Sequence, residues 1–157
     1  MNVWYVNSIL GTFRLEEEND AICGLTLCPD GVPELEPLPR KVCETPLLQE
    51  AEEQLNEYFA GARREFDLPL APKGTPFQKA VWAEMNKIPY GETRTYSQLA
   101  AAVGKPKASR AVGGACHCNP IAILQPCHRV VGSTGRLTGY AYGVEMKQYL
   151  LELEKQE

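Results

Sequence analysis

A cysteine stands next to one of the chain's two histidines in the segment Ile123-Leu-Gln-Pro-Cys-His-Arg-Val-Val131. The thiolate is the nucleophilic form of cysteine, and a neighbouring base or cation lowers the pKa of the thiol so that the thiolate forms. Because apolar residues flank Cys127 and His128, we expect both to be buried. The pattern indicates an activated nucleophile in a pocket. An inert core cysteine accounts for Cys127 equally well, since free cysteine is among the most buried residue types.

Charges are distributed unevenly along the chain. The net charge is −4, yet residues 93–144 contain no Asp or Glu. That segment carries +6 and the remainder therefore −10, and its basic residues are Arg94, Lys105, Lys107, Arg110, Arg129 and Arg136. Such asymmetry indicates a basic face that meets an anion. The alternative is chance clustering of charges on a solvated surface.

The composition is that of an ordinary globular protein. The chain has 157 residues, 44% of them hydrophobic and 23% charged, which predicts one domain or two small ones. No apolar run is long enough to cross a bilayer, and the first residues lack the features of a signal peptide. We therefore expect a cytoplasmic protein with no membrane partner, whose six cysteines are reduced.

The N-terminal half predicts a small β-rich unit. Apolar or β-branched runs between turn residues predict three strands, at residues 2–6, 11–15 and 21–27. Four prolines make 29–40 an irregular connection. Thr45-Pro46 predicts the start of a helix that continues to Phe59 and ends at Gly61.

The boundary of this unit is predicted near residue 72. Residues 66–70 have the composition of a further strand, and 69–74 has that of a linker. We therefore divide the chain into a unit of residues 1–72 and a unit of residues 73–157.

The second unit begins with a predicted helix. The segment Thr75-Pro-Phe-Gln78 is a capping box with proline at the first helical position. Its apolar stripe continues to Ile88, and Pro89-Tyr-Gly91 ends it. A helix at the end of the chain is predicted to start near Val144. Glu154 lies one position after Leu153, which belongs to the apolar stripe of this helix, so its side chain can point back toward the core.

Two short helices between these predict a helix-turn-helix. They span 96–103 and 108–118 and are joined by Gly104-Lys-Pro-Lys107. Gly113 and Gly114 lie inside the second helix, where each costs about 1 kcal/mol relative to alanine. The helix therefore packs tightly against the Cys127 segment or enters a DNA groove, with Arg110 as its one long reaching side chain. The two are compatible, because opposite faces of the helix can serve each.

Pro126-Cys-His-Arg-Val-Val131 resembles the signature of the O6-alkylguanine-DNA alkyltransferases, which move alkyl groups from guanine O6 to their own cysteine. The resemblance covers roughly residues 75–154. It is carried further, in the same order, by Thr75-Pro-Phe-Gln-Lys-Ala-Val-Trp82, Pro89-Tyr-Gly-Glu-Thr93, Tyr96-Ser-Gln-Leu-Ala100, Arg110-Ala-Val-Gly-Gly114, Asn119-Pro120 and Gly139-Tyr140. It implies a mixed α/β (α+β) fold, with a small N-terminal β-rich ribonuclease-H-like unit and a C-terminal helical domain that contains the helix-turn-helix.

The resemblance also implies a role for each matching residue. Cys127 corresponds to the alkyl acceptor, His128 to the base that takes its proton through a bridging water, and Glu154 to the carboxylate that orients the histidine. This is the logic of nucleophile, base and orienting group. Asn119 corresponds to the residue that ties the recognition helix to the cysteine loop, and Tyr96 to a proton donor near the flipped nucleotide.

Contacts to DNA and substrate are implied in the same way. Arg110 corresponds to the arginine that fills the base stack after the target base leaves, and Tyr140 and the Val130 backbone to the walls that receive guanine. The remaining residues that we assign to DNA or substrate contacts are Ser133, Arg129, Tyr142 and Lys147.

The implied partner is double-stranded DNA that contains O6-alkylguanine. An alkyl group on O6 is hidden in a duplex, so the nucleotide must be flipped out, and the resemblance implies that the helix-turn-helix does this from the minor groove. The product is a thioether with no hydrolytic exit, so each molecule acts once. We expect no cofactor, no metal and a monomer.

Two other functions stay open. One is a non-catalytic DNA-damage-binding or regulatory helix-turn-helix protein in which Cys127 is merely buried. The other is a Cys-His hydrolase of acyl substrates, which would turn over steadily and would leave the basic segment unexplained.

Three features depart from the family pattern. Tyr142 stands where the family commonly has glycine, so it either narrows the alkyl pocket or points to solvent. The group Cys116, His117, Cys118 and Cys127 has the residue types of a metal site, but its spacing matches no standard zinc pattern. The N-terminal cysteines, which we expect to be core or partly buried thiols, are Cys23, Cys28 and Cys43.

Overall fold

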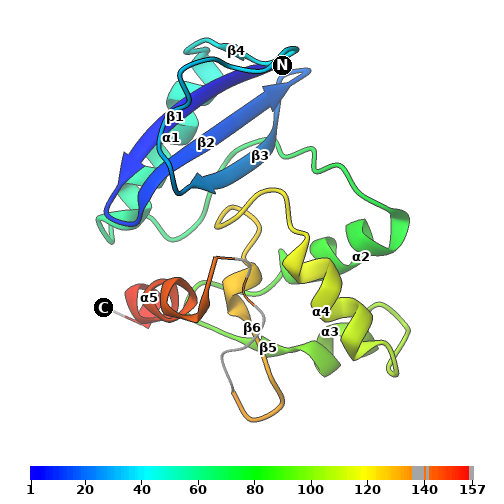
Figure 1. Ribbon diagram of the computed structural model, residues 1–157. Coiled ribbons are helices and arrows are strands. Elements are labelled where there is room, and N and C mark those ends of the chain that lie inside the picture. Colours follow the sequence, from blue (N-terminus) through cyan, green and yellow to red (C-terminus); the bar gives the residue numbers. More distant parts are fainter. Residues whose placement is uncertain (136–139, 141, 156–157) are drawn as a thin grey trace. The chain divides into compact units, whose positions relative to one another are not determined.

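The computed structural model describes residues 1–135, 140 and 142–155. They belong to two units, Met1–Pro72 and Lys73–Glu157 (Figure 1). Each unit has its own core, and each is described here by itself.

An antiparallel sheet forms the N-terminal unit. Its three long strands are β1 (Asn2–Ser8), β2 (Gly11–Glu18) and β3 (Ala21–Cys28). Val6 lies opposite Phe13, and Leu15 lies opposite Leu25, so apolar side chains from all three strands share one face. Asn19 and Asp20 form the β2–β3 turn with φ of 54° and 62°, a conformation that their short polar side chains tolerate. The three predicted strands are confirmed.

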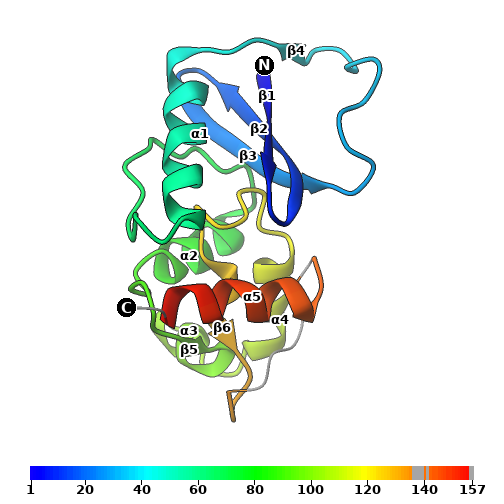
Figure 2. The same cartoon turned by 90° about the vertical axis from the view of Figure 1, so that its left-hand side faces the viewer.

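Helix α1 (Pro46–Phe59) covers the apolar face of this sheet (Figure 2). The Thr45 side chain accepts a hydrogen bond from the Leu48 main-chain N–H, and Pro46 occupies the first turn, as the sequence predicted. Leu48 and Leu55 are buried, and the Phe59 ring stacks on Phe13 at 6.3 Å. The helix therefore seals the core of this unit.

Two details of the N-terminal unit differ from the sequence prediction. Residues 66–70 form no strand; only Leu70 makes a parallel bridge to Ile22, while the Phe66 ring packs on Tyr58 at 5.3 Å. A fourth strand, β4 (Lys41–Val42), pairs in parallel with β1 and was not predicted. Its two residues carry no alternation pattern, and the pairing depends on the distant strand β1.

Three helices form the body of the second unit: α2 (Pro76–Met85), α3 (Tyr96–Ala102) and α4 (Ser109–His117). Both α2 and α3 begin with a capping box, at Thr75 and Thr95. They pack against one another and against α4. The Trp82 indole N–H donates to the Ala115 carbonyl oxygen at 2.9 Å and so anchors α4 to α2. The predicted helix-turn-helix is α3, a turn at Gly104 with φ of 79°, and α4.

The segment after α4 carries the Cys-His pair and returns to the core. It passes through a 3₁₀ helix, η1 (Cys127–Arg129), into β6 (Val130–Val131), which pairs in parallel with β5 (Arg94–Thr95). Helix α5 (Val144–Lys155) then packs on η1. The small β5–β6 sheet was not predicted, and α2 ends at Met85 rather than at Ile88, which is buried in the turn that follows.

Candidate active site

Cys127 and His128 are buried, as predicted. The side chain of Cys127 is 6% exposed and that of His128 is fully covered. Residues 121–131 are all buried, because this segment runs through the core of the second unit. The Cys127 main-chain N–H donates to the Gln125 carbonyl oxygen at 2.8 Å, which turns the chain tightly at the cysteine.

Asn119 connects the end of α4 to the thiol. Its Nδ2 donates to Cys127 Sγ at 3.2 Å and to the Gln125 carbonyl oxygen at 2.9 Å. Its Oδ1 accepts from the Ile121 main-chain N–H at 3.0 Å and from Gln125 Nε2 at 2.7 Å. The amide is therefore fully hydrogen-bonded, with its NH₂ group directed at the sulfur.

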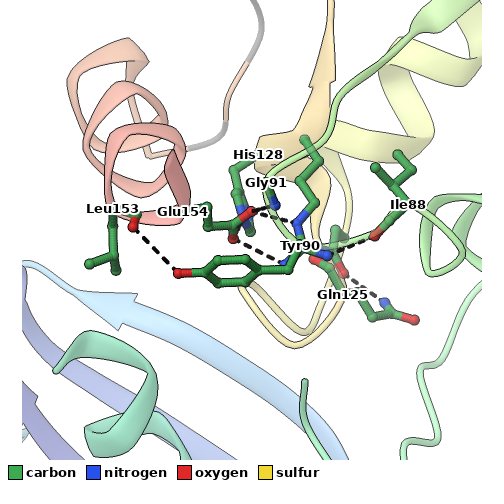
Figure 3. A network of polar contacts seen from close by, with 9 residues as sticks. Ile88, Tyr90, Gly91, Gln125, His128, Leu153 and Glu154 are labelled. Atoms are coloured by element: carbon green, nitrogen blue, oxygen red, sulfur yellow. Dashed lines mark hydrogen bonds and ion pairs between the residues drawn. The ribbon is translucent and has the colours of Figure 1, made fainter. Parts of the chain in front are cut away.

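His128 and Glu154 form a buried pair. His128 Nε2 lies 2.6 Å from Glu154 Oε2, in the network drawn in Figure 3. Burial alone would raise the pKa of Glu154, but hydrogen bonds and charge from His128 and Arg129 outweigh it and lower the pKa to about 2. Burial lowers the pKa of His128 more than Glu154 raises it. The pair is therefore a carboxylate and a neutral imidazole.

These charge states determine the tautomer of His128. An ionised carboxylate can only accept a hydrogen bond, so His128 Nε2 carries the proton and Nδ1 carries the lone pair. Nδ1 is buried, and no residue in the described part of the chain hydrogen-bonds to it. His128 thus presents a free acceptor nitrogen, which is the property required of a base.

Arg129 occupies a different place from the one expected. Its Nε donates to Glu154 Oε1 at 2.8 Å, and its Nη1 donates to the Ile88 carbonyl oxygen at 2.8 Å. The residue is 7% exposed, so its guanidinium holds the network together from inside the unit. The assignment of Arg129 to a DNA or substrate contact stays a prediction; the charge that Arg129 meets in the structure is the carboxylate of Glu154.

The turn after α2 closes the network from the other side. The Gly91 main-chain N–H donates to Glu154 Oε1 at 3.3 Å, and Tyr90 Oη donates to the Leu153 carbonyl oxygen at 3.4 Å (Figure 3). Gly91 has φ of 79°, and a Cβ there would meet the Glu154 carbonyl oxygen at 3.2 Å. Glycine is therefore the residue that lets this turn approach α5 so closely.

Burial disfavours the thiolate form of Cys127. Burial raises its pKa, and the hydrogen bond from Asn119 and the charge of Lys147 oppose that rise without reversing it. Desolvation in the core is the larger effect, and the activation of the thiol by His128 stays a prediction. The nucleophile must form by proton removal during the reaction.

Lys147 is a buried cation close to the thiol. It is 1% exposed, and its Nζ donates to Tyr96 Oη at 3.5 Å and lies 5.7 Å from the centre of the Tyr96 ring. Burial lowers the pKa of Lys147, while the thiols of Cys127 and Cys116 raise it. The ammonium therefore favours the thiolate and places a positive charge beside the Tyr96 hydroxyl.

Tyr140 and Tyr142 pack edge to face, with ring centres 5.9 Å apart. The Tyr140 hydroxyl is buried beside the Cys127 thiol, with which it interacts. Burial first, and then the charge of Cys127, raise the pKa of Tyr140 well above its ordinary value. Tyr142 is half-buried, so it does not point fully into solvent.

Comparison with known proteins agrees with this arrangement. Residues 76–156 match the family model for the 6-O-methylguanine DNA methyltransferase DNA binding domain, and residues 3–72 match the ribonuclease-like domain of the same family. The chain belongs to the 6-O-methylguanine DNA methyltransferase family. The predicted resemblance and the predicted mixed fold, a ribonuclease-like unit with a helical DNA-binding domain, are both confirmed.

Several methyltransferase relatives are similar over most of the chain. A methylated-DNA–protein-cysteine methyltransferase of Methanosarcina acetivorans is 59% identical over 106 residues, 68% of either chain. The constitutive one of Bacillus subtilis is 48% identical over 149 residues, 93% of this chain and 90% of its own. The crystal structure of Mycobacterium tuberculosis OGT in complex with DNA has a TM-score of 0.89 at 41% identity, covering 99% of this chain and 93% of that one.

In this family member, the exposed face of α4 carries small side chains and has a basic residue, Arg110, near its N-terminal end. Arg110, Gly114 and His117 are exposed on one side of the helix. A Cβ on Gly114 would meet nothing within 4 Å, and one on Gly113 would make only ordinary contact with Tyr96. Packing against the Cys127 segment therefore does not explain the two glycines.

The other predicted positions vary in exposure. Val130 is buried in β6, and Ser133 is exposed. Arg136 belongs to residues 136–139, which lie outside the described part of the chain.

The described residues contain no group of three or more His, Cys, Asp or Glu placed to hold a metal. None of the six cysteines forms a disulfide; Cys23 is buried, and Cys28 and Cys43 are partly buried, as predicted. Over the described residues, no helix has the length and apolar character to cross a membrane.

Gln125 is the site residue that the sequence analysis missed. It is buried at 1% exposure and contacts Asn119 through both its main chain and its side chain. A glutamine inside the apolar run 121–126 was the available signal, since a buried amide must find hydrogen-bond partners.

Proposed function

We propose that this chain repairs O6-methylguanine in DNA by transferring the methyl group to its own Cys127. The observation that carries the proposal is the buried Cys127 thiol, hydrogen-bonded to Asn119 and followed by a His128 whose Nδ1 is free to accept a proton. Membership of the family, and relatives named methylated-DNA–protein-cysteine methyltransferases, support it.

The chemistry is a displacement at the methyl carbon. The Cys127 proton leaves toward His128 Nδ1, through a water that the family resemblance implies. Sγ then forms a bond to the methyl carbon, the bond from that carbon to O6 breaks, and its electron pair stays on guanine. The imidazolium that forms is stabilised by Glu154 at 2.6 Å.

Tyr96 is the proposed proton donor to the departing guanine. Its oxygen accepts from Lys147 Nζ at 3.5 Å, and a phenol O–H is a group that can protonate a leaving base. The nearby ammonium also favours a partial negative charge on that oxygen as its proton moves. The product at Cys127 is a thioether, and nothing in the site supplies a route to cleave it, so each molecule acts once.

DNA is proposed to lie along α4. The helix exposes Arg110 and the open surface at Gly114, and Lys105 and Lys107 are exposed in the turn before it. The small side chains let the backbone approach a narrow groove, for which we propose the minor groove. In this proposal, Arg110 fills the stack once the nucleotide has flipped. One chain suffices, because a single unit carries both the thiol and α4, and a reducing cytoplasm would keep the thiol available.

Incubation with a duplex that contains O6-methylguanine, followed by intact mass and peptide mapping, tests the proposal. We expect one methyl group on the peptide that contains Cys127. Cys127→Ser should abolish transfer and retain DNA binding, whereas Cys116→Ser, which removes the other buried thiol of this unit, should still be methylated at Cys127.

The alternatives give different results in the same assay. DNA binding without any mass change would indicate a damage-binding protein, and repeated turnover would indicate a hydrolase. Methyl groups found on Cys116 or Cys118 would overturn the assignment of the acceptor.

A further inference from the structure

A chain of three amides leads from the end of α2 to the Cys127 thiol. Asn86 Nδ2 donates to Gln125 Oε1 at 3.4 Å, Gln125 Nε2 donates to Asn119 Oδ1 at 2.7 Å, and Asn119 Nδ2 donates to Cys127 Sγ at 3.2 Å. Gln125 and Asn119 each accept at the amide oxygen and donate at the amide nitrogen, so the chain has one direction. Gln125, drawn in Figure 3, stands in its middle.

We propose that Gln125 is a positioning residue for the acceptor: its side chain holds the Asn119 amide with the NH₂ group on the Cys127 sulfur and so stabilises the attacking thiolate. The inference rests on the proposed function only for the identity of Cys127 as the acceptor. Gln125 itself touches neither the sulfur nor, in the proposed reaction, the methyl group.

The orientation of Asn119 is the quantity that Gln125 controls. If the Asn119 amide were reversed, its oxygen would face the sulfur and its NH₂ group would face two donors, Gln125 Nε2 and the Ile121 N–H. A thiolate would then meet a negative oxygen in place of an N–H donor. Three contacts oppose this reversal: the Gln125 side chain at 2.7 Å, the Ile121 N–H at 3.0 Å, and the Gln125 carbonyl oxygen, which accepts from Asn119 Nδ2 at 2.9 Å. The contact from the Gln125 side chain is the shortest of them and the only one that a substitution at residue 125 removes.

Gln125 also strengthens the hydrogen bond that Asn119 donates. A hydrogen bond accepted at the amide oxygen polarises the amide and makes its N–H a better donor, an effect that is larger in a low-dielectric core. A donor directed at a charged acceptor favours the charged form. Gln125 therefore acts on the thiolate through Asn119, in addition to the charge that Lys147 supplies.

Packing alone does not explain a glutamine at this position. Residue 125 lies in an otherwise apolar run and is 1% exposed, where an aliphatic side chain would carry no polar atoms to satisfy. Both polar atoms of the Gln125 side chain are instead hydrogen-bonded, one of them to the residue that contacts the thiol.

Alkylation of Cys127 by iodoacetamide without DNA is the direct test. This reagent reacts with the thiolate, so the S–C bond forms as iodide leaves, and peptide mapping isolates Cys127 from the other thiols. The rate is measured from pH 6.5 to pH 10 for wild type, Gln125→Leu and Gln125→Glu. Gln54→Leu is the matched control, because Gln54 is a buried glutamine of the other unit, bonded to Glu50 and Asp67.

We expect Gln125→Leu to react about threefold to tenfold more slowly at neutral pH and to reach the wild-type rate at high pH, since a charged hydrogen bond is weakened and not removed. Gln125→Glu should show the larger shift, because an ionised carboxylate cannot donate to Asn119 Oδ1. Methyl transfer from duplex DNA should slow by similar factors at unchanged DNA affinity. Gln54→Leu should leave the pH profile as in wild type.

A wild-type pH profile in both Gln125 variants would overturn the proposal, and so would the same shift in Gln54→Leu. If Gln125→Leu does not fold, Gln125→Glu preserves the size of the side chain, and Asn86→Ala removes the exposed end of the amide chain and should shift the profile slightly in the same direction. The iodoacetamide profile is read without DNA. It therefore decides the role of Gln125 even if no methyl transfer is found.

Discussion

Glu154 Oε2 lies 2.6 Å from His128 Nε2, and this contact determines which nitrogen of the histidine can act as a base. Because Glu154 is ionised, Nε2 must donate to it, and the lone pair is left on Nδ1. The same carboxylate pairs with Arg129 at 2.8 Å. The ion pair with Arg129 keeps Glu154 charged in the core, and the charged Glu154 keeps His128 in the basic tautomer.

Glu154→Gln should therefore impair the base. An amide can donate to Nε2, which would place the proton on Nδ1, so we expect methyl transfer to slow about 10²- to 10⁴-fold. The melting temperature should also fall, because Arg129 loses its buried partner. Single-turnover rates and thermal scans measure the two effects. Glu152→Gln, on the exposed side of the same helix, is the control; a folded Glu154→Gln protein within twofold of the wild-type rate would refute the tautomer argument.

The stability of the second unit should fall in acid. The pKa of Glu154 is lowered from 4.5 to about 2, so its contribution is complete above pH 4.5 and is lost as the pH falls through 2. The pKa of His128 is also lowered from 6.5, so its contribution begins to decline as the pH falls below 6.5. The carboxyl shift corresponds to about 3 kcal/mol. Urea unfolding at pH 7, 5 and 3, followed by Trp82 fluorescence in a Trp4→Phe background, measures the part of this contribution that is lost above pH 3; an equally steep decline in Glu154→Gln would contradict the assignment.

Arg110→Ala should slow repair of O6-methylguanine in a duplex without slowing the methyl-transfer step itself. Arg110 is exposed on α4, whereas Cys127 is buried. The proposed role of Arg110 is therefore limited to filling the gap that the flipped nucleotide leaves in the DNA base stack. We expect repair in a duplex to slow about tenfold or more, because the cost of extrusion is no longer offset. Reaction with the free base O6-methylguanine should be unchanged. Equal losses on both substrates would remove the stack-filling role.

DNA affinity should depend only moderately on salt concentration, because few exposed cations are available to contact phosphates. Of the six cations in residues 93–144, Arg129 is buried, Arg94 is paired with Glu92 and Arg136 lies outside the described residues. The exposed ones are Lys105, Lys107 and Arg110. Three phosphate contacts predict a slope of log affinity against log salt of about −3, falling to about −1 in the double variant Lys105→Gln, Lys107→Gln. Arg63→Gln, in the other unit, should leave the slope unchanged, and an unaltered slope in the double variant would place the contacts elsewhere.

Tyr142 should limit the size of the alkyl group. Its half-buried ring packs on Tyr140, which is proposed to receive guanine. Overpacking costs about 1 to 3 kcal/mol, or roughly a 5- to 150-fold loss in rate for benzyl-sized groups. Tyr142→Gly should recover reactivity toward O6-benzylguanine while methyl transfer changes little. No gain with the benzyl substrate would show that Tyr142 is not a pocket wall.

Local patterns in the sequence determined the helices, the long strands and the burial of the Cys-His pair. Thr45, Thr75 and Thr95 cap helices through hydrogen bonds within three residues, and apolar periodicity acts over one element at a time. The family resemblance likewise came from short motifs around Cys127. Such interactions are readable in a sequence because both partners lie in the same short segment.

Tertiary structure decided what connects segments far apart in the chain. The β5–β6 pairing, the Arg129–Glu154 ion pair and the approach of Gly91 to Glu154 join residues separated by 25 positions or more. The raised pKa of Cys127 depends on desolvation by the whole core, and the amide chain through Gln125 depends on where α2 ends beside the cysteine loop. No local pattern encodes these, because they arise only when packing brings the segments together.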